Sequence, residues 1–147
     1  MKSIFQLSLI LVLFASCTSL RDKDDDPKFK ELSQKFLDEF EETHPSYASQ
    51  VGLEKYDPIL QIPDASNRAD RTAFYVKYLD LFQDVDVDEL SFSQRTDREL
   101  IINELEGSLW SYNQFRPFEW NPSAYNIGSA VSSVLEKEKR PLDDRIK

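Results

Sequence analysis

The chain of 147 residues contains one cysteine, one histidine and three glycines. One cysteine excludes an internal disulfide, and one histidine excludes a zinc site built from several imidazoles of this chain. With so few glycines and no sustained alternation of apolar and polar residues, a sheet of short strands is not expected. The sequence therefore predicts a helical protein with no cofactor bound by this chain alone.

Positive charge is also scarce, because 18 lysines and arginines face 27 acidic residues and the formal net charge is −9. Such a surface repels a phosphate backbone, and no cluster of basic residues offsets it. We therefore expect no nucleic-acid partner. Hydrophobic residues make up 40% of the chain, which is enough for a packed core.

The N-terminus resembles a bacterial lipoprotein signal. Lys2 precedes an apolar stretch at residues 4–14, and small residues lead from there into Cys17. The stretch is shorter than the roughly 20 apolar residues needed to span a bilayer, so it reads as a cleavable signal. We predict a signal peptide at residues 1–16 and a lipid anchor on Cys17 that holds the protein to a membrane. A plain secretory signal and a buried first helix are the alternatives.

Residues 17–26 would then form the lipidated cysteine and a charged tether, which self-repulsion keeps extended. The acidic run at residues 24–26 resembles the export signals that send some lipoproteins to the outer face of the outer membrane, although a solvated spacer explains it equally well. Thr18, in place of Asp, fits delivery to the outer membrane. The expected location is the bacterial cell envelope, at the outer membrane.

Residues 27–147 predict an all-α array of about four to five helices. Asp26 and Pro27 form a cap followed by proline at the first helical position. Further helices are expected at about residues 66–83, from a capping box at Thr96 and Glu99, and from Asn121. A loop should cover residues 56–64, and an acidic turn residues 84–88.

Three of the four helices carry apolar residues on two faces, and a body of this size cannot bury so many faces by itself. Residues 141–147 also have the composition of a helix start. We therefore expect residues 27–147 to be the N-terminal part of a larger all-helical protein, either truncated or separately encoded.

Several segments form a recognisable series, namely residues 36–40, 45–52, 56–60, 97–100, 105–106 and 115–125. In order and spacing they resemble the N-terminal part of the bacterial domain-of-unknown-function 885 family. The resemblance implies an envelope-associated, zinc-peptidase-like protein several times longer than this chain, whose metal site lies downstream in a His-Glu-x-x-Pro-Gly-His-His type motif. This sequence lacks that motif. The resemblance therefore implies a scaffold role, with no catalytic or metal residue in this chain and zinc only in a full-length relative.

Two places could serve a binding function. Tyr56 and Asp57 lead into a loop where their side chains could reach a cleft, although an Asp before Pro58 is also a common turn cap. An aromatic group with one arginine could bind a carbohydrate or a peptide, or could instead form a packed corner between helices. Its members are Tyr112, Phe115, Arg116, Phe118 and Trp120.

His44 falls at the end of the first helix, where we expect it to cap the helix as a cation or to be exposed. The leading functional hypothesis is an envelope lipoprotein that provides the helical scaffold of a zinc-peptidase-like protein and is inactive alone. Its partner would be the missing C-terminal catalytic portion. The alternatives are a stand-alone lipoprotein that binds a partner at its surface, and an accessory subunit of a separately encoded catalytic chain.

Overall fold

The computed structural model describes residues 23–135 and residue 143. The predicted signal peptide at residues 1–16, the lipidation site Cys17 and nearly all of the predicted helix start at residues 141–147 lie outside the described residues. The described part of the chain is helical and contains no strand, which confirms the all-α prediction. Its α-helices are α2 (Pro27–Thr43), α3 (Pro45–Gln50), α4 (Ala65–Gln83), α5 (Phe92–Trp110), α6 (Pro117–Trp120) and α7 (Gly128–Leu135).

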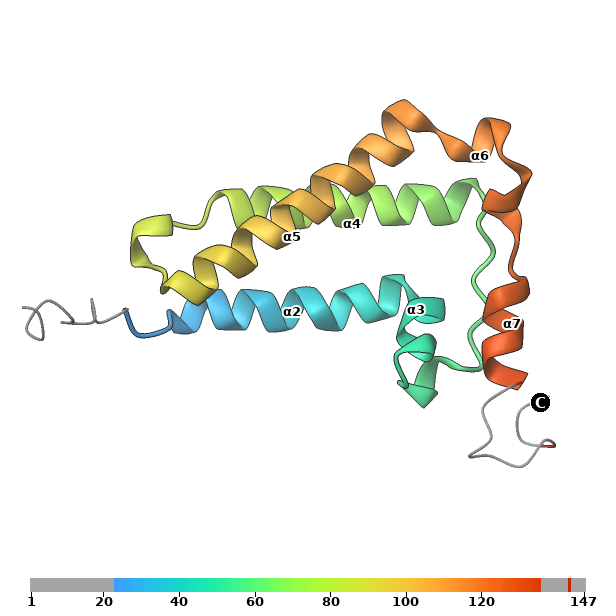
Figure 1. The fold of residues 1–147 in the computed structure, drawn as a ribbon, viewed down its shortest axis with the longest axis horizontal. Helices are drawn as coiled ribbons and strands as arrows, with labels where there is room; N and C mark the ends of the chain where they lie inside the picture. Colours follow the sequence, from blue (N-terminus) through green and yellow to red (C-terminus); the bar gives the residue numbers. More distant parts are fainter. Residues whose placement is uncertain (1–22, 136–142, 144–147) are drawn as a thin grey trace, which may run out of the picture.

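Three long helices form the body of the molecule (Figure 1), and α4 packs against both α2 and α5. From the end of α5 the chain turns through α6 and descends to α7, which packs against α3. α4 therefore packs on two sides. The last helices thus close one end of the molecule, beside the segment that links α3 to α4 (Figure 1).

The helix starts follow capping chemistry. The side chain of Asp26 accepts hydrogen bonds from the backbone N–H groups of Lys28 and Phe29, and Pro27 follows it as predicted. Asp64 caps α4 through the N–H of Asn67. Each cap satisfies backbone donors that the first turn of a helix leaves without partners.

Two predicted helix starts were wrong. α5 begins at Phe92, because Ser91 and Gln94 form the capping box, whereas the hydroxyl of Thr96 donates to the Phe92 carbonyl one turn inside the helix. No α-helix starts at Asn121, which instead caps a short 3₁₀ turn at Pro122–Tyr125. α7 follows only at Gly128, where the Asn126 side chain accepts from the backbone N–H.

The core is rich in aromatic rings. Phe36 of α2 stacks on Phe74 of α4 with ring centroids 5.7 Å apart, and meets Tyr78 and Phe82 edge-on at 5.1 and 5.5 Å. Offset and edge-to-face arrangements at these distances are the favourable geometries for ring pairs. The buried cluster consists of Phe29, Phe36, Phe74, Tyr75, Tyr78, Phe82, Leu90 and Leu105. The face of α2 that carries Phe29 and Phe36 is therefore the face that packs.

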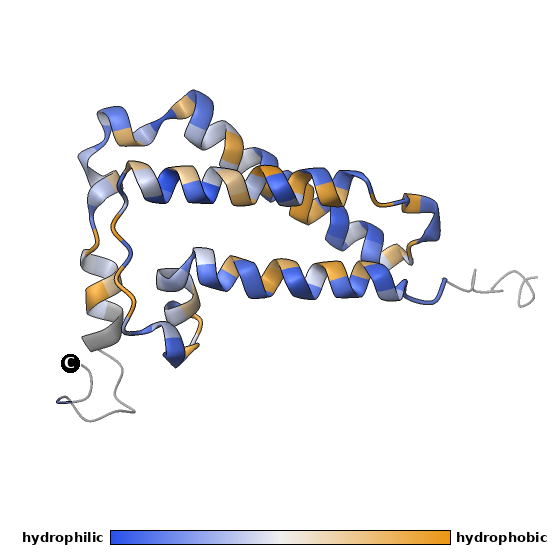
Figure 2. Cartoon of the chain, turned by 180° about the vertical axis from the view of Figure 1, so that it is seen from behind, coloured by the Kyte–Doolittle hydropathy of each residue, from blue (hydrophilic) through white to orange (hydrophobic). Residues whose placement is uncertain are grey.

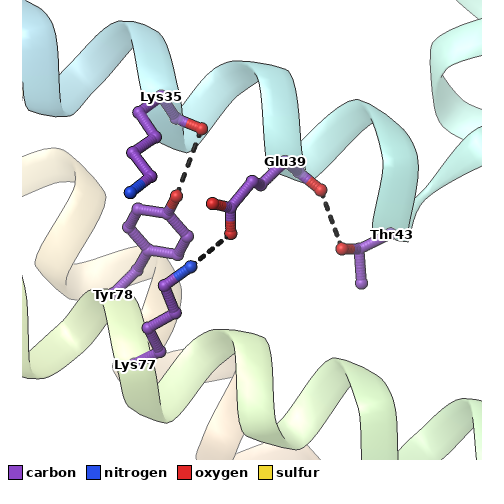
Figure 3. Close-up of polar contacts among 5 residues, drawn as sticks. All are labelled: Lys35, Glu39, Thr43, Lys77 and Tyr78. Carbon is purple, nitrogen blue, oxygen red and sulfur yellow. Dashed lines mark hydrogen bonds and ion pairs between the residues drawn. The ribbon is translucent and has the colours of Figure 1, made fainter.

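Polar contacts flank this core between α2 and α4 (Figure 3). The Tyr78 hydroxyl donates to the Lys35 carbonyl at 3.2 Å, and Lys77 forms an ion pair with Glu39. The ammonium of Lys77 holds the pKa of the Glu39 carboxyl below its usual value. The Tyr78 side chain is buried but its hydroxyl is hydrogen-bonded, so burying this polar group costs little free energy of folding.

Two buried polar side chains of α5 form hydrogen bonds with the end of α4 and the start of α2. The guanidinium of Arg98 donates to the carbonyls of Phe82 and Gln83, at 2.8 and 3.1 Å, and so satisfies the last turn of α4. The amide of Gln94 exchanges hydrogen bonds with the backbone of Asp26, at 2.8 and 2.9 Å. Residues 97–100, one of the segments of the family resemblance, thus include a residue with a structural task in this fold.

Candidate functional site

A cavity of about 440 Å³ lies at the end of the molecule that α6 and α7 close. α4 provides one wall, the end of α5 and the turn after it provide another, and α3 and α7 complete it. The lining residues come from segments far apart in the sequence and include Gln61, Asn67, Arg68, Arg71, Tyr75, Ser108, Tyr112, Phe118, Asn126 and Ile127. Its volume is that of a site for a small molecule.

Two arginines of α4 define the polar part of the cavity. The guanidinium of Arg71 donates to the Gln61 side chain and, at 3.4 Å, to the hydroxyl of Tyr112. Arg68 donates to the Pro63 carbonyl at 3.1 Å and lies over the ring of Phe118, 4.3 Å from its centroid. Both guanidinium groups are therefore held in defined orientations by uncharged partners.

A hydrogen-bonded pair connects the cavity wall to the core. The hydroxyl of Tyr75 lies 2.7 Å from Nε2 of His44, whose Nδ1 lies 3.1 Å from the Phe40 carbonyl. Because a carbonyl oxygen only accepts, Nδ1 carries the proton and Nε2 accepts from the tyrosine. Burial, assisted by the positive charge of Arg71, lowers the pKa of His44 to about 4, and burial raises the pKa of Tyr75 to about 12.

The expectation for His44 was therefore right about its place and wrong about its state. It is the C-cap residue of α2, but the ring is 7% exposed and stacks on Phe40 at 4.1 Å between centroids. A buried imidazole without an acidic partner stays neutral at pH 7. The sequence could not reveal this, because Tyr75 follows 31 residues later.

The structure divides the predicted aromatic group into two parts. Tyr112 and Phe118 line the cavity, and the guanidinium of Arg116 lies 5.7 Å from the Phe118 ring. Phe115 stacks on Trp110 at 5.4 Å and meets Trp120 edge-on at 5.1 Å. Trp110, Phe115 and Trp120 are 57%, 47% and 58% exposed, and we call them the aromatic corner.

A local irregularity of the backbone presents this corner. α5 continues into a single π-helical turn at Ser111–Phe115, and Arg116 then adopts a left-handed conformation with φ 48° before Pro117. The indole N–H of Trp120 donates to the Phe115 carbonyl at 3.0 Å. Such turns redirect side chains at a helix end, and they recur at functional sites.

Tyr56 and Asp57 lie away from the cavity lining. Tyr56 is buried, and the Asp57 carboxylate accepts a hydrogen bond from the Ser49 hydroxyl at 2.6 Å. This contact joins α3 to the 3₁₀ turn at Glu54–Tyr56, next to Gly52 with its φ of 101°. These are the contacts of a folded turn, and a role of the pair in a cleft stays a prediction.

Sequence reasoning missed Arg68 and Arg71. No local motif marks them, because their partners lie in the segment between α3 and α4, in the π-helical turn and in α6. Within residues 23–135 and 143, no three side chains of His, Cys, Asp or Glu gather in a group that could hold a metal ion. Nor does any helix in those residues have the length and apolar composition needed to cross a membrane.

Comparison with known proteins shows a likeness to a solved structure. No protein-family model matches the chain, and no curated protein matches it. The resemblance to the domain-of-unknown-function 885 family therefore stays a prediction. The chain is similar to a structure from Shewanella oneidensis that is described as "a putative lipoprotein of unknown function", with 28% sequence identity and a TM-score of 0.74. The match covers 80% of this chain and 21% of that chain, so this chain spans about a fifth of the length of its structural neighbour.

Proposed function

We propose that this chain is the helical N-terminal scaffold of an envelope lipoprotein, anchored through Cys17, and that it packs against the remainder of a longer molecule. The observation that carries the proposal is apolar surface on the outer faces of the helices. Phe92 and Leu100 of α5 are 74% and 63% exposed, and Leu37 of α2 and Val76 of α4 are also exposed. These exposed side chains lie on three helices, and contact with another part of a protein would remove them from water.

The segment between α3 and α4 adds to this surface. Ile59, Leu60 and Ile62 are exposed in this stretch, where hydrophobic and hydrophilic residues alternate along the backbone (Figure 2). The exposed parts of these branched side chains do not stabilise the fold of the described helices. Burial against a neighbouring body would recover about 25 cal/mol for each Å² removed from water.

The similar structure supports the same proposal in two ways. It is described as a lipoprotein, in agreement with the signal read from residues 1–17, and it is several times longer than the match. By the resemblance to the domain-of-unknown-function 885 family, the remainder would be a zinc-peptidase-like body, with the metal-binding motif in that part. We expect this chain alone to have no peptidase activity.

The test compares the isolated chain with a charged variant. The purified chain should bind a hydrophobic dye and self-associate, and Leu100→Glu combined with Phe92→Glu should reduce both. Glu106→Lys, a charge change at an exposed position of the same helix, is the matched control and should leave both unchanged. A wild-type chain that is monomeric, melts cooperatively and binds no dye would contradict the scaffold proposal.

Two further measurements concern the anchor and the activity. Cys17→Ser should move the protein from the membrane fraction to the soluble envelope fraction, because it removes the acylated thiol. Peptide hydrolysis by the isolated chain with added zinc should remain at the background rate. Appreciable zinc-dependent turnover would refute the scaffold role.

The aromatic corner favours a second candidate, a stand-alone lipoprotein that captures a partner at its surface. Exposed Trp and Phe side chains in contact with one another are frequent anchors of protein interfaces. The DNA downstream of the codon for Lys147 distinguishes the two. A continuing reading frame with a histidine-rich motif supports the scaffold, and a stop codon followed by an unrelated gene supports the stand-alone protein.

A further inference from the structure

We propose that the cavity between α4 and α7 is a binding site for a small organic carboxylate, held by Arg68 and Arg71. The proposal does not depend on the scaffold role, because it concerns only residues of this chain. Four observations support it, namely the charge of the wall, the unused donors of the two arginines, the mixed lining and the volume.

The charge of the wall is opposite to that of the molecule. The chain carries a formal net charge of −9, yet among the described residues the cavity lining contains two arginines and no acidic side chain. The other polar groups of the lining are uncharged amides and hydroxyls, such as those of Gln61, Asn67 and Ser108. An anion that enters therefore meets a positive field that no carboxylate of the lining offsets, strengthened by the low dielectric of the walls.

The two arginines also differ from the cations that form ion pairs in this fold. Lys55, Lys77, Arg98 and Arg116 each lie within 4.0 Å of a carboxylate oxygen. Across residues 23–135 and 143, neither Arg68 nor Arg71 forms such an ion pair. A partly buried guanidinium without a counterion is costly, and a bound anion would remove that cost.

Their hydrogen-bonding capacity is largely unused. A guanidinium has five N–H donors, and within the described part of the chain Arg71 engages Gln61 and Tyr112 while Arg68 engages the Pro63 carbonyl. Nε of Arg71 is buried and has no hydrogen-bond partner among these residues. The unused donors of Arg71 that can serve a ligand are therefore those on its terminal nitrogens. These nitrogens have the planar geometry that binds a carboxylate through two hydrogen bonds.

The rest of the lining selects the body of the ligand. Tyr75, Tyr112 and Phe118 present rings, and Ile127 and Ala130 present aliphatic groups. A strongly hydrated inorganic anion gains nothing from these groups, whereas a carboxylate attached to an aromatic or branched side chain gains contact with them. A volume of about 440 Å³ suits a ligand about the size of an acylated amino acid.

The test is calorimetric titration of the complete chain, purified in detergent, with N-acetyl-phenylalanine, its amide and inorganic phosphate. The acid should bind about tenfold more tightly than the amide, because only the acid offers a charged acceptor to the guanidinium groups. Arg71→Gln and Arg68→Gln should each weaken binding of the acid by about tenfold, as expected for loss of a charge-assisted hydrogen bond. Lys30→Gln, at an exposed position on α2 outside the cavity lining, removes the same charge and should have no effect.

A second readout separates binding from folding. His44 is the one histidine of the chain and bonds to Tyr75 of the cavity wall, so its ring resonances should shift when the acid binds. The shift should require about tenfold more acid in both arginine variants, whose helical circular dichroism should match that of the wild type. If Arg71→Gln misfolds, Arg68→Gln alone tests the proposal, because the hydrogen bond of Arg68 among the described residues goes to a loop carbonyl.

Three results would overturn the proposal. The first is equal affinity for acid and amide, and the second is unchanged affinity in both arginine variants when they are folded. Tighter binding of inorganic phosphate than of the acid would be the third, because it would show an anion site that makes no use of the apolar wall.

Discussion

The two halves of α4 face interiors of opposite character. In the C-terminal half, Tyr78 and Phe82 are fully buried among the rings of α2. In the N-terminal half, Arg68 and Arg71 face a cavity of about 440 Å³. A close-packed half holds the helices together, and an open polar half of the same helix is left for a ligand. Stability and binding in this fold are thus separated along one helix and can be changed independently.

The largest effect is expected from the packed half. Phe82→Ala removes a ring that contacts Phe29 at 5.9 Å and Phe36 at 5.5 Å, and no solvent reaches the site. It should lower the free energy of unfolding by about 3–5 kcal/mol in urea denaturation.

The control is Phe92→Ala on the exposed side of α5, which should change the free energy of unfolding by no more than about 0.5 kcal/mol. If the two variants were equally destabilised, Phe82 would not belong to a close-packed core.

The second prediction concerns the boundary between the halves, where His44 bonds to Tyr75. Its pKa is about 4 in the folded protein and 6.5 as the ordinary value, so the unfolded chain binds more protons between these pH values. The stability that neutral His44 contributes is therefore fully present above pH 6.5 and is lost as the pH falls toward 4. At about 1.4 kcal/mol for each pH unit, the loss is about 3 kcal/mol.

Urea denaturation between pH 4.5 and 7.5 measures this loss, and His44→Gln should flatten the dependence in that range. The carboxyl of Glu39, whose pKa is lowered by Lys77, contributes its stability above its ordinary pKa and loses it only as the pH falls below that value. The two contributions therefore fall in different pH ranges. Parallel curves for the wild type and His44→Gln would refute the neutral, buried state of the ring.

These examples show how far sequence reasoning reaches in this protein. Local signals were enough where both partners lie within one turn, as with Asp26 capping α2. The start of α5 was misplaced because a second capping box, Ser91 and Gln94, lies just before Thr96, and contacts with Asp25 and Asp26 far away in the sequence favour it. The cavity could not be predicted at all, since its wall joins α3, α4, α5 and α7.

A third, intermediate effect is expected where α5 fastens the packed end of α4. Arg98→Met keeps the apolar stem but leaves the carbonyls of Phe82 and Gln83 without their donor. The free energy of unfolding should fall by about 1–3 kcal/mol, the cost of buried acceptors without partners.

Glu99→Gln is the matched control, because Arg98 also forms an ion pair with this exposed carboxylate at 2.8 Å. An exposed pair contributes about 0–1 kcal/mol, so this variant should lose much less than Arg98→Met. Equal losses would mean that the ion pair, and not the cap on α4, is what Arg98 contributes.

The smallest effect belongs to the open end, at the turn that presents the aromatic corner. Arg116 has φ 48° and ψ 56°, a left-handed conformation that costs a non-glycine residue about 1–2 kcal/mol. Arg116→Gly relieves this cost but adds flexibility to the unfolded chain, so the free energy of unfolding should change by less than about 1 kcal/mol. Arg116→Val should instead lower it by about 1 kcal/mol, because a β-branched side chain fits this conformation poorly.

Both variants lose the ion pair with Glu119, so their difference isolates the backbone. Thermal unfolding of the pair measures that difference, and the intrinsic fluorescence of Trp110 and Trp120 reports whether the aromatic corner keeps its arrangement. Should the valine variant be as stable as the glycine variant, the left-handed turn would not be a constraint in solution. The aromatic corner would then owe its exposure to the π-helical turn alone.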